Sequence, residues 1–481
     1  MLTFCSAGLC RVGWNLERVQ KLLRGLLALA AVWGLAIFLC RCWLVLSLPY
    51  QLEYGEGHML GLAYWLKQGR SIYAPGPNPP WAFGFHFPLY LWLVSRCMGD
   101  IPSFFAGRLI SITASLVALT ASAAWLKAKA GNQAALAGLA FLLLHPLLLG
   151  WAPLERVDTL ALAFSVLAIL SARRPAVAAP LCLLSLFCKQ SFVAAPLAVA
   201  LSLQRKQGLL FLAVYGLASL ALLLILGNTV FPGLLTLHSK LSSDPASAMT
   251  LWVTCAPTLL LLAALAYLAP RDLQGSQVWR YYAFTSLIPA AAALKQGSYY
   301  YYFLELHWAL SILAASALAQ PDRLRCGLTV IQLLLGSCCR FPILESPLNH
   351  WRHETWAWLR GDQPAWRKRM QAYDQLGEVL ARYPGPVLAE QCGNPLLFGR
   401  EPLVCDCFAL FYDQARAGFQ VKPLLEMIRQ RRIGVILLQR LDESNLRVPI
   451  DVIQLILQHY QVTGKVGSDF VLTPRVEPVK P

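Results

Sequence analysis

Charged residues are scarce in this chain. They make up 14% of its 481 residues, whereas 57% are hydrophobic, and the mean hydropathy is +0.52. A soluble domain carries roughly 25% charged residues. The shortage excludes an ordinary soluble enzyme, and the long apolar runs indicate a polytopic α-helical membrane protein.

Several sequence signatures are also missing. The first apolar stretch, about residues 26–48, has no small-residue cleavage pattern, so we expect an uncleaved first transmembrane helix rather than a signal peptide. The 14 cysteines include no pair of CxxC motifs typical of zinc sites. The histidines lack the spacing that puts two ligands on one helix face, so we expect no histidine metal site. No internal repeat or low-complexity tract stands out.

The net charge of +16 comes from basic residues that recur in short loops between the apolar runs. The positive-inside rule places such loops in the cytoplasm, and the dispersion argues against a nucleic-acid partner. The basic clusters are Arg11 to Arg24, Lys127 with Lys129, Arg173 with Arg174, Arg205 with Lys206, Arg271 with Arg280, and Arg323 with Arg325.

The resulting topology has about eleven spans, a cytoplasmic N-terminus and an outward C-terminus. We expect the spans near residues 25–48, 105–126, 132–151, 158–172, 175–188, 191–204, 208–227, 251–269, 281–294, 303–319 and 326–343. The apolar segment 83–96 is only about 14 residues long, which favours an interfacial or re-entrant helix.

The composition changes after about residue 346. Strand-like runs at 386–390 and 433–438, with a helix-like stretch at 422–432 between them, predict a small α/β domain. We therefore expect a membrane domain of residues 1–345, with a large first outer loop at about 49–104, and a soluble extracytoplasmic domain of residues 346–481. If that domain is extracytoplasmic, Cys392, Cys405 and Cys407 could include one disulfide.

The outward loops contain the unusual polar residues. Acids and bases gathered at one membrane depth are what a site for an anionic, lipid-linked substrate would need. These residues are Glu53 and Glu56 in the first loop, Arg156 and Asp158 before the fourth span, Lys189 and Gln190 after the fifth, and Lys295 and Glu305 around the start of the tenth.

Such a set could transfer a sugar from a lipid phosphate. A carboxylate, Glu53 or Glu56, could take the acceptor proton. Cations are needed to neutralise the departing phosphate, and Lys189, Lys295 and Arg156 are the candidates. Tyr73 and the tyrosine run 299–302 could form a wall that faces the sugar or the isoprenoid.

Structural roles compete with each of these assignments. Glu53 and Glu56 could be a solvated rim, and Arg156 with Asp158 could be an ion pair at a helix start. Lys189 could extend to the interface. The tyrosine run could be an aromatic belt. Glu305 could serve only the start of its helix.

The order of these features resembles the GT-C superfamily of polytopic glycosyltransferases, in the branch that contains the lipid A aminoarabinose transferases and the protein O-mannosyltransferases (glycosyltransferase family 39-like). The resemblance covers about residues 20–320. It rests on Glu53-Tyr-Gly-Glu56-Gly after the first helix, Gly69-x-x-x-Tyr73, His86-x-Pro-Leu-Tyr90, Arg108 at the second helix, Asp158 at the fourth and Lys189 after the fifth.

The resemblance implies an inverting glycosyltransferase with a polyprenyl-phosphate-sugar donor. It implies Glu56 as the likeliest base, with Glu53 as the competitor. This branch generally uses no metal cofactor, although other GT-C enzymes use a divalent ion. We expect a bacterial inner membrane location and an acceptor of unknown class. The substrate-binding residues expected are Asp158, Arg156, Lys189, Gln190, Lys295, Tyr73, His86 and Glu305. The alternative is a transporter or flippase for a lipid-linked or anionic substrate.

Overall fold

The structure is a computed structural model of the whole chain. It describes residues 16–73, 76–227, 244–295, 298–338, 364–414 and 421–475. The predicted domain boundary near residue 346 and most of the predicted outer loop at 228–250 lie outside this range.

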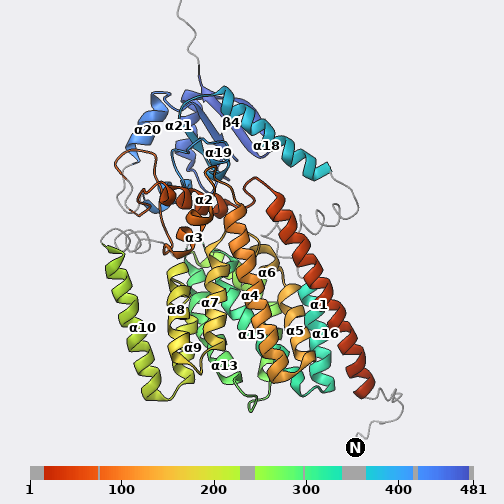
Figure 1. The fold of residues 1–481 in the computed structure, drawn as a ribbon. Coiled ribbons are helices and arrows are strands. Elements are labelled where there is room, and N and C mark those ends of the chain that lie inside the picture. The colour runs from red at the N-terminus through yellow and green to blue at the C-terminus, as the bar shows by residue number, and fades with distance from the viewer. Residues whose placement is uncertain are drawn as a thin grey trace, which may run out of the picture.

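Apolar helices form a bundle below a smaller α/β region (Figure 1). In the described part of the chain, five helical segments are long and apolar enough to span a membrane: Leu16–Ser47, Phe105–Ala130, Arg205–Ile225, Ala248–Tyr267 and Tyr300–Ala319. Three shorter apolar helices accompany them: Asn132–Leu143, Val157–Leu170 and Pro175–Cys188. The chain is therefore a multi-pass membrane protein, while the number of spans, expected to be about eleven, stays a prediction.

The helices of the bundle follow the predicted spans closely. They are α1 (Leu16–Ser47), α4 (Phe105–Ala130), α5 (Asn132–Leu143), α6 (Pro146–Trp151), α7 (Val157–Leu170), α8 (Pro175–Cys188), α9 (Ala194–Ser202), α10 (Arg205–Ile225), α12 (Pro245–Tyr267), α13 (Ser276–Thr285), α14 (Leu287–Ala291), α15 (Leu304–Ser316) and α16 (Arg323–Cys338). Short 3-10 turns are η1 (Ala292–Leu294), η2 (Tyr300–Phe303) and η3 (Ala317–Ala319).

Two predicted spans are interrupted. The expected helix 132–151 divides into α5 and α6 at His145, where Pro146 starts a new helix and the His145 ring accepts a hydrogen bond from the Leu147 amide. Proline fits the first turn of a helix but not its interior. The expected helix 281–294 divides into α13, α14 and η1. Backbone away from lipid tolerates such breaks because other protein groups or water satisfy it.

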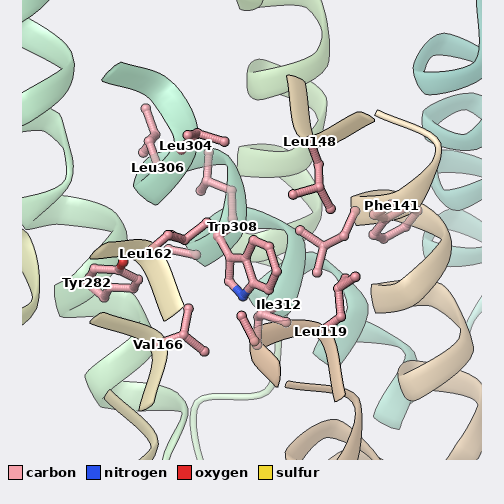
Figure 2. Packing of buried hydrophobic residues seen from close by; sticks show 14 of the residues in the cluster. Leu119, Phe141, Leu148, Leu162, Val166, Tyr282, Leu304, Leu306, Trp308 and Ile312 are labelled. Atoms are coloured by element: carbon pink, nitrogen blue, oxygen red, sulfur yellow. The ribbon is translucent and has the colours of Figure 1, made fainter. Parts of the chain in front are cut away.

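Helix α15 forms the centre of the bundle (Figure 2). In an apolar 18-residue window of the span that contains α15, 89% of the residues are buried, whereas the corresponding share for α10 is 11%. Trp308 of α15 packs among apolar side chains of neighbouring helices, including Leu119, Leu162 and Val166. Its indole nitrogen donates a 3.0 Å hydrogen bond to Ser122 Oγ. Small residues permit close packing: a Cβ at Gly138 would lie 2.3 Å from Leu126 Cδ1.

The end of the bundle below the α/β region carries α2 (Tyr54–Lys67) and α3 (Leu89–Cys97) (Figure 1). α3 is the helix expected within residues 83–96, and it is shorter than that segment. Helix α4 ends, and α10 and α13 begin, at the opposite end of the bundle (Figure 1). These termini carry basic clusters, so the basic loops and the first-loop glutamates lie at opposite ends, as the charge pattern predicted.

The α/β region contains a four-stranded sheet with the order β1-β2-β4-β3. β1 (Val387–Ala389) and β2 (Val435–Leu438) are the two predicted strands and pair in parallel. β3 (Tyr460–Val466) and β4 (Asp469–Pro474) form an antiparallel hairpin that the sequence analysis missed. The helical elements are α18 (Pro364–Arg382), α19 (Gly393–Leu396), the π-helix η5 (Ala409–Gln414), α20 (Lys422–Arg429) and α21 (Ile450–His459).

The first loop and the α/β region are joined by hydrogen bonds. The Gln51 amide donates to Asn394 Oδ1 at 3.0 Å, and the Trp81 amide donates to the Leu403 carbonyl at 2.9 Å. The cysteines near this junction form no disulfide: Cys392, Cys405 and Cys407 are free thiols. The expectation of a disulfide among them was wrong. Each is buried and serves as a small apolar side chain.

Candidate active site

The first turn of α2 places two glutamates close to each other in different environments. Glu53 is the N-cap, and its Oε2 accepts a 2.9 Å hydrogen bond from the Gly55 amide. Acidic residues are favoured in this position because the helix N-terminus carries partial positive charge and unpaired N–H groups. Glu56 follows within the first turn.

Glu56 is fully buried and fully hydrogen-bonded. Its Oε1 accepts from Arg108 Nε at 2.9 Å and from the Glu155 amide at 3.0 Å. Its Oε2 accepts from Arg108 Nη2 at 2.9 Å and from the Leu52 amide at 2.9 Å. Burial alone would raise the pKa of Glu56, but the charge and hydrogen bonds of Arg108 hold the pKa below its ordinary value. Glu56 thus ties α2 to α4 as a buried ion pair.

Glu53 is partly exposed, with 23% of its side chain accessible. Within the described residues, the hydrogen bonds donated to the Glu53 carboxylate all reach Oε2. They come from the Gly55 amide and from Arg156 Nη1 at 3.0 Å. Its Oε1 therefore remains available as an acceptor. Of the two predicted catalytic acids, Glu53 lines a cavity and Glu56 does not.

A cavity of about 540 Å³ opens between the bundle and the α/β region, and we call it the bundle cavity. Its lining contains four cations and two acids: Arg156, Lys189, Lys295 and Arg447, with Glu53 and Asp406. Aromatic residues make up much of the remaining wall: Tyr54, Phe85, Trp151, Tyr299, Tyr301, Tyr302 and Phe408. The excess of positive charge and the aromatic wall suit an anion carried on an apolar chain.

Two cations of the bundle cavity, Arg156 and Lys189, lie close to the faces of aromatic rings. The guanidinium of Arg156 lies 5.1 Å from the Trp151 ring and 5.4 Å from the Tyr301 ring. Lys189 Nζ lies 3.5 Å from the centre of the Tyr301 ring and hydrogen-bonds to Asp158. Such contacts stabilise cations without neutralising them. The tyrosine run is thus part of this polar site rather than only a membrane belt.

Six of the ten predicted site residues line the bundle cavity: Glu53, His86, Arg156, Lys189, Gln190 and Lys295. The structure brings them together from four separate loops. Gln190 is fixed there because its side-chain nitrogen donates to the Phe85 carbonyl at 2.6 Å.

The other predicted site residues lie behind the lining. Asp158 pairs with Lys189 and lies 3.6 Å from Arg156 Nε, so it orients cations and is not itself at the cavity surface. Tyr73 donates its hydroxyl to the His86 carbonyl at 2.6 Å. Glu305 is buried in the bundle and accepts a 3.0 Å hydrogen bond from the Tyr282 hydroxyl. Tyr73 and Glu305 therefore contact no ligand placed in this cavity.

The α/β region supplies site residues that the sequence analysis missed. Asp406 accepts the Tyr54 hydroxyl at 2.7 Å and lies 3.2 Å from His58 Nδ1. Arg447 lies over the Tyr54 ring at 4.1 Å and donates to Glu390 at 2.8 Å. The contacts of Asp406 and Arg447 with Tyr54 and His58 join residues more than 300 positions apart, and no local pattern in the sequence signals them.

A second cavity, of about 640 Å³, lies on the other side of Glu53, and we call it the junction cavity. It shares Glu53, Tyr54, Trp151, Tyr299 and Arg447 with the bundle cavity. Its other lining residues come from the end of α1, from α18 and from the β3–β4 hairpin. Glu53 therefore lies at the border of two cavities.

Across the described ranges, no group of three or more histidine, cysteine, aspartate or glutamate side chains is arranged to hold a metal ion. The acids at the site are instead paired with cations or with hydroxyls, as Glu53 is with Arg156 and Asp406 with Tyr54. The residues present thus offer hydrogen-bonding and charge-pairing groups.

No family model and no curated protein matches this chain. Solved structures do. ArnT from Cupriavidus metallidurans aligns in the apo state with a TM-score of 0.60 at 13% identity, and bound to undecaprenyl phosphate with a TM-score of 0.58 at 12% identity. Each alignment covers 92% of this chain and 97% of ArnT. An oligosaccharyltransferase from Archaeoglobus fulgidus aligns with a TM-score of 0.44 at 12% identity, over 93% of this chain and 73% of that one. The resemblance to GT-C proteins is confirmed at the level of the fold, which this chain shares with ArnT over almost its whole length.

Proposed function

We propose that this protein is a membrane glycosyltransferase that moves a sugar from a polyprenyl-phosphate donor to an acceptor hydroxyl. The observation that carries the proposal is the position of Glu53: a carboxylate with an available oxygen borders a cation-rich cavity on one side and a second cavity on the other. The shared fold with ArnT, which binds undecaprenyl phosphate, supports the class of donor.

The donor phosphate is assigned to the bundle cavity. Arg156 and Lys189 are both nearly buried, with side chains 10% and 4% exposed, so charge on them is less screened than on a surface lysine. Asp158 behind them fixes their positions. Lys295 lines the same cavity. Cations placed in this way stabilise the negative charge that grows on the phosphate as the sugar departs. The aromatic wall accommodates the sugar and the first isoprene units.

Glu53 is assigned as the general base in preference to Glu56. A base needs an accessible oxygen within hydrogen-bond reach of the proton it removes. Glu53 Oε1 meets this need. Both oxygens of Glu56 are occupied by Arg108 and backbone amides, and the residue is fully buried. Glu56 is therefore proposed to hold the first turn of α2, and with it Glu53, in place.

The reaction follows from these assignments. The acceptor O–H gives its proton to Glu53, and the acceptor oxygen forms a bond to the anomeric carbon. The bond between that carbon and the phosphate oxygen breaks, and its electron pair leaves with the polyprenyl phosphate, held by Arg156 and Lys189. A single displacement from the opposite face inverts the anomeric configuration. Glu53 then loses its proton to solvent.

The test uses the full-length protein in lipid nanodiscs with a panel of undecaprenyl-phosphate sugars and a membrane glycolipid extract as acceptor. Wild type should release undecaprenyl phosphate from at least one donor. The sugar should be recovered on an acceptor, with its anomeric configuration inverted relative to the donor. Glu53→Gln should abolish release while it keeps the lipid bound. Release by Glu53→Gln at the wild-type rate would remove the assignment of the base.

A transporter or flippase would use the same cations to bind its cargo. In sealed proteoliposomes it would move undecaprenyl-phosphate sugars between leaflets without cleaving them. Translocation without release of undecaprenyl phosphate, in the same preparations that bind the lipid, would favour that function over transfer.

A further inference from the structure

We infer that the junction cavity is the acceptor site and that it accepts the neutral hydroxyl groups of a glycan. This inference rests on the proposed function, because it assigns the second substrate of the same reaction. It concerns the lining that the α/β region contributes, of whose residues only Arg447 is shared with the bundle cavity.

Charge separates the two cavities. The bundle cavity has four cations and two acids in its lining. The junction cavity has Arg41 and Arg447 with Glu53 and Asp469. Burial raises the pKa of Asp469 to about 7, so this lining carries less than one net positive charge at neutral pH, against two in the bundle cavity. A phosphate group therefore gains more in the bundle cavity than in the junction cavity. The ligand of the junction cavity is therefore expected to carry little net charge.

Polar but uncharged groups dominate the rest of the junction cavity. Four carboxamides line it, against one in the bundle cavity, and they are Gln51, Gln391, Asn394 and Gln439. Carboxamides both donate and accept hydrogen bonds, as hydroxyls do. The Gln51 side chain already donates to the carbonyls of Glu53 and Tyr54 and accepts from the Gly393 amide, so the other three are assigned to the ligand. Five aromatic residues complete the wall: Tyr50, Tyr54, Trp151, Tyr299 and Tyr373.

The segment after β2 and the turn of the β3–β4 hairpin together present a chain of hydrogen-bonding groups to this cavity. Arg447 Nη1 donates to Gln439 Oε1 at 2.7 Å, and Gln439 Nε2 donates to Ser468 Oγ at 3.1 Å. Ser468 Oγ in turn donates to Asp469 Oδ1 at 3.4 Å. The chain is held in place at one end by the contact of Arg447 with Glu390, so its members have fixed directions before any ligand binds.

A peptide strand fits this place less well. Addition of a strand needs an open sheet edge, but the lining of this cavity includes a single edge-strand residue, Val466 at the end of β3. A glycan needs no sheet edge. It also brings many hydroxyls, one of which can approach Glu53 Oε1 from the junction side while the donor sugar approaches from the bundle side.

The experiment measures binding by the full-length protein in nanodiscs. The probes are fluorescently labelled neutral oligosaccharides of hexose and N-acetylhexosamine, the same oligosaccharides with a phosphate, short polar peptides, and undecaprenyl phosphate. Wild type should bind one or more neutral oligosaccharides, and a phosphate on them should give no gain in affinity. The double variant Gln439→Ala/Ser468→Ala should bind that oligosaccharide about tenfold more weakly, because it loses one or two hydrogen bonds. Its affinity for undecaprenyl phosphate should stay within twofold of wild type.

Lys189→Met provides the opposite variant, with undecaprenyl phosphate binding weakened by roughly 10–100-fold and oligosaccharide binding kept. Gln439 and Ser468 are partly or fully exposed, so their substitution is compatible with folding, which the unfolding temperature checks. Preference for peptides or for phosphorylated oligosaccharides, no neutral oligosaccharide bound, or equal binding by the double variant would overturn the inference. If the proposed function is wrong, the result differs: wild type should then bind oligosaccharide without binding undecaprenyl phosphate.

Discussion

Glu53 and Glu56 lie three positions apart at the start of α2, and the structure uses them in opposite ways. Glu56 is inaccessible, with a guanidinium and two backbone amides on its oxygens. One oxygen of Glu53 accepts from Gly55 and Arg156, the other accepts no hydrogen bond from the described residues, and the residue lines a cavity. An acidic pair in a sequence can therefore combine one anchor with one reactive group, and the number of hydrogen bonds to each carboxylate tells them apart.

The anchor also explains how the reactive group is held. Arg108 of α4 donates to Glu56 and to the carbonyls of Val45 and Tyr50 at the end of α1. These bonds fix α1, α2 and α4 to one another at the base of the site. Glu53 is thereby positioned by the rigid part of the bundle, as a catalytic group needs to be.

The largest expected effect is on catalysis at Glu53. Glu53→Gln should lower the rate of sugar transfer by about 10²–10⁴-fold, the usual contribution of a general base, with the unfolding temperature close to wild type. Transfer is measured as release of undecaprenyl phosphate in single-turnover assays. If Glu53→Gln weakens donor binding by the same factor as it lowers the transfer rate, then Glu53 only shapes the cavity.

Glu56→Gln should lower the stability of the folded protein, in contrast to Glu53→Gln, which should lower the rate of transfer. Removing one partner of a buried ion pair costs roughly 3–5 kcal/mol, because the remaining charge stays buried. We expect low yield of folded protein and a clearly lower unfolding temperature in detergent. The surface pair of Arg70 and Glu401 is the matched control, with side chains 36% and 32% exposed; Glu401→Gln should cost less than about 1 kcal/mol. A stable, inactive Glu56→Gln would restore Glu56 as the base.

Lys189→Met should sharpen the assignment of the bundle cavity. Loss of one charged hydrogen-bond donor is expected to weaken undecaprenyl phosphate binding by about 1.5–3 kcal/mol, or roughly 10–100-fold. The control is Lys129→Met, at the opposite end of the bundle, where the lysine is exposed and hydrogen-bonds to Gln274. Equal affinities for both variants and wild type would place the phosphate elsewhere.

A further expected effect is a pH dependence of stability that arises in the junction cavity. Burial, with Glu390 nearby, raises the pKa of Asp469 from an ordinary 3.8 to about 7. Between those values the folded state binds more protons than the unfolded state, so this residue contributes stability at low pH that is lost as pH rises to about 7. The full effect is at most ~4 kcal/mol, at 1.36 kcal/mol per pH unit.

Asp469→Asn should therefore flatten the fall in stability between pH 5 and pH 8, measured by denaturant or thermal unfolding at several pH values. Asp451→Asn, at an exposed position of α21, serves as the control and should keep the wild-type profile. A wild-type slope in Asp469→Asn would mean that another group titrates there.

The bundle was largely predictable from the sequence because lipid imposes long apolar runs with charged ends, and charge alternation orders them. The breaks at Pro146 and within 281–294 depend on local packing and were not foreseen. Strands β1 and β2 were predictable because they are short, buried and apolar. β3 is exposed along most of its length and lacks that signal. β4 is mostly buried, but its apolar run is only the three residues 470–472, and the hairpin was missed.

The site was predictable only in part, for a physical reason. Hydropathy and charge placed Glu53, Arg156, Lys189 and Lys295 at one membrane surface, and folding brings them to one cavity. The sequence cannot tell which of two acids meets a buried arginine, since that depends on where α4 crosses α2. The contacts of Asp406 and Arg447 are long-range, so they too required the fold.

The most direct test is a structure of the full-length protein with undecaprenyl phosphate in a nanodisc, together with its Glu53→Gln variant. The account predicts the phosphate within hydrogen-bond distance of Arg156 and Lys189 in both, with Glu53 beside it and Glu56 still bound to Arg108. A phosphate outside the bundle cavity, or one held by Glu56 and Arg108 after their pair has opened, would contradict it.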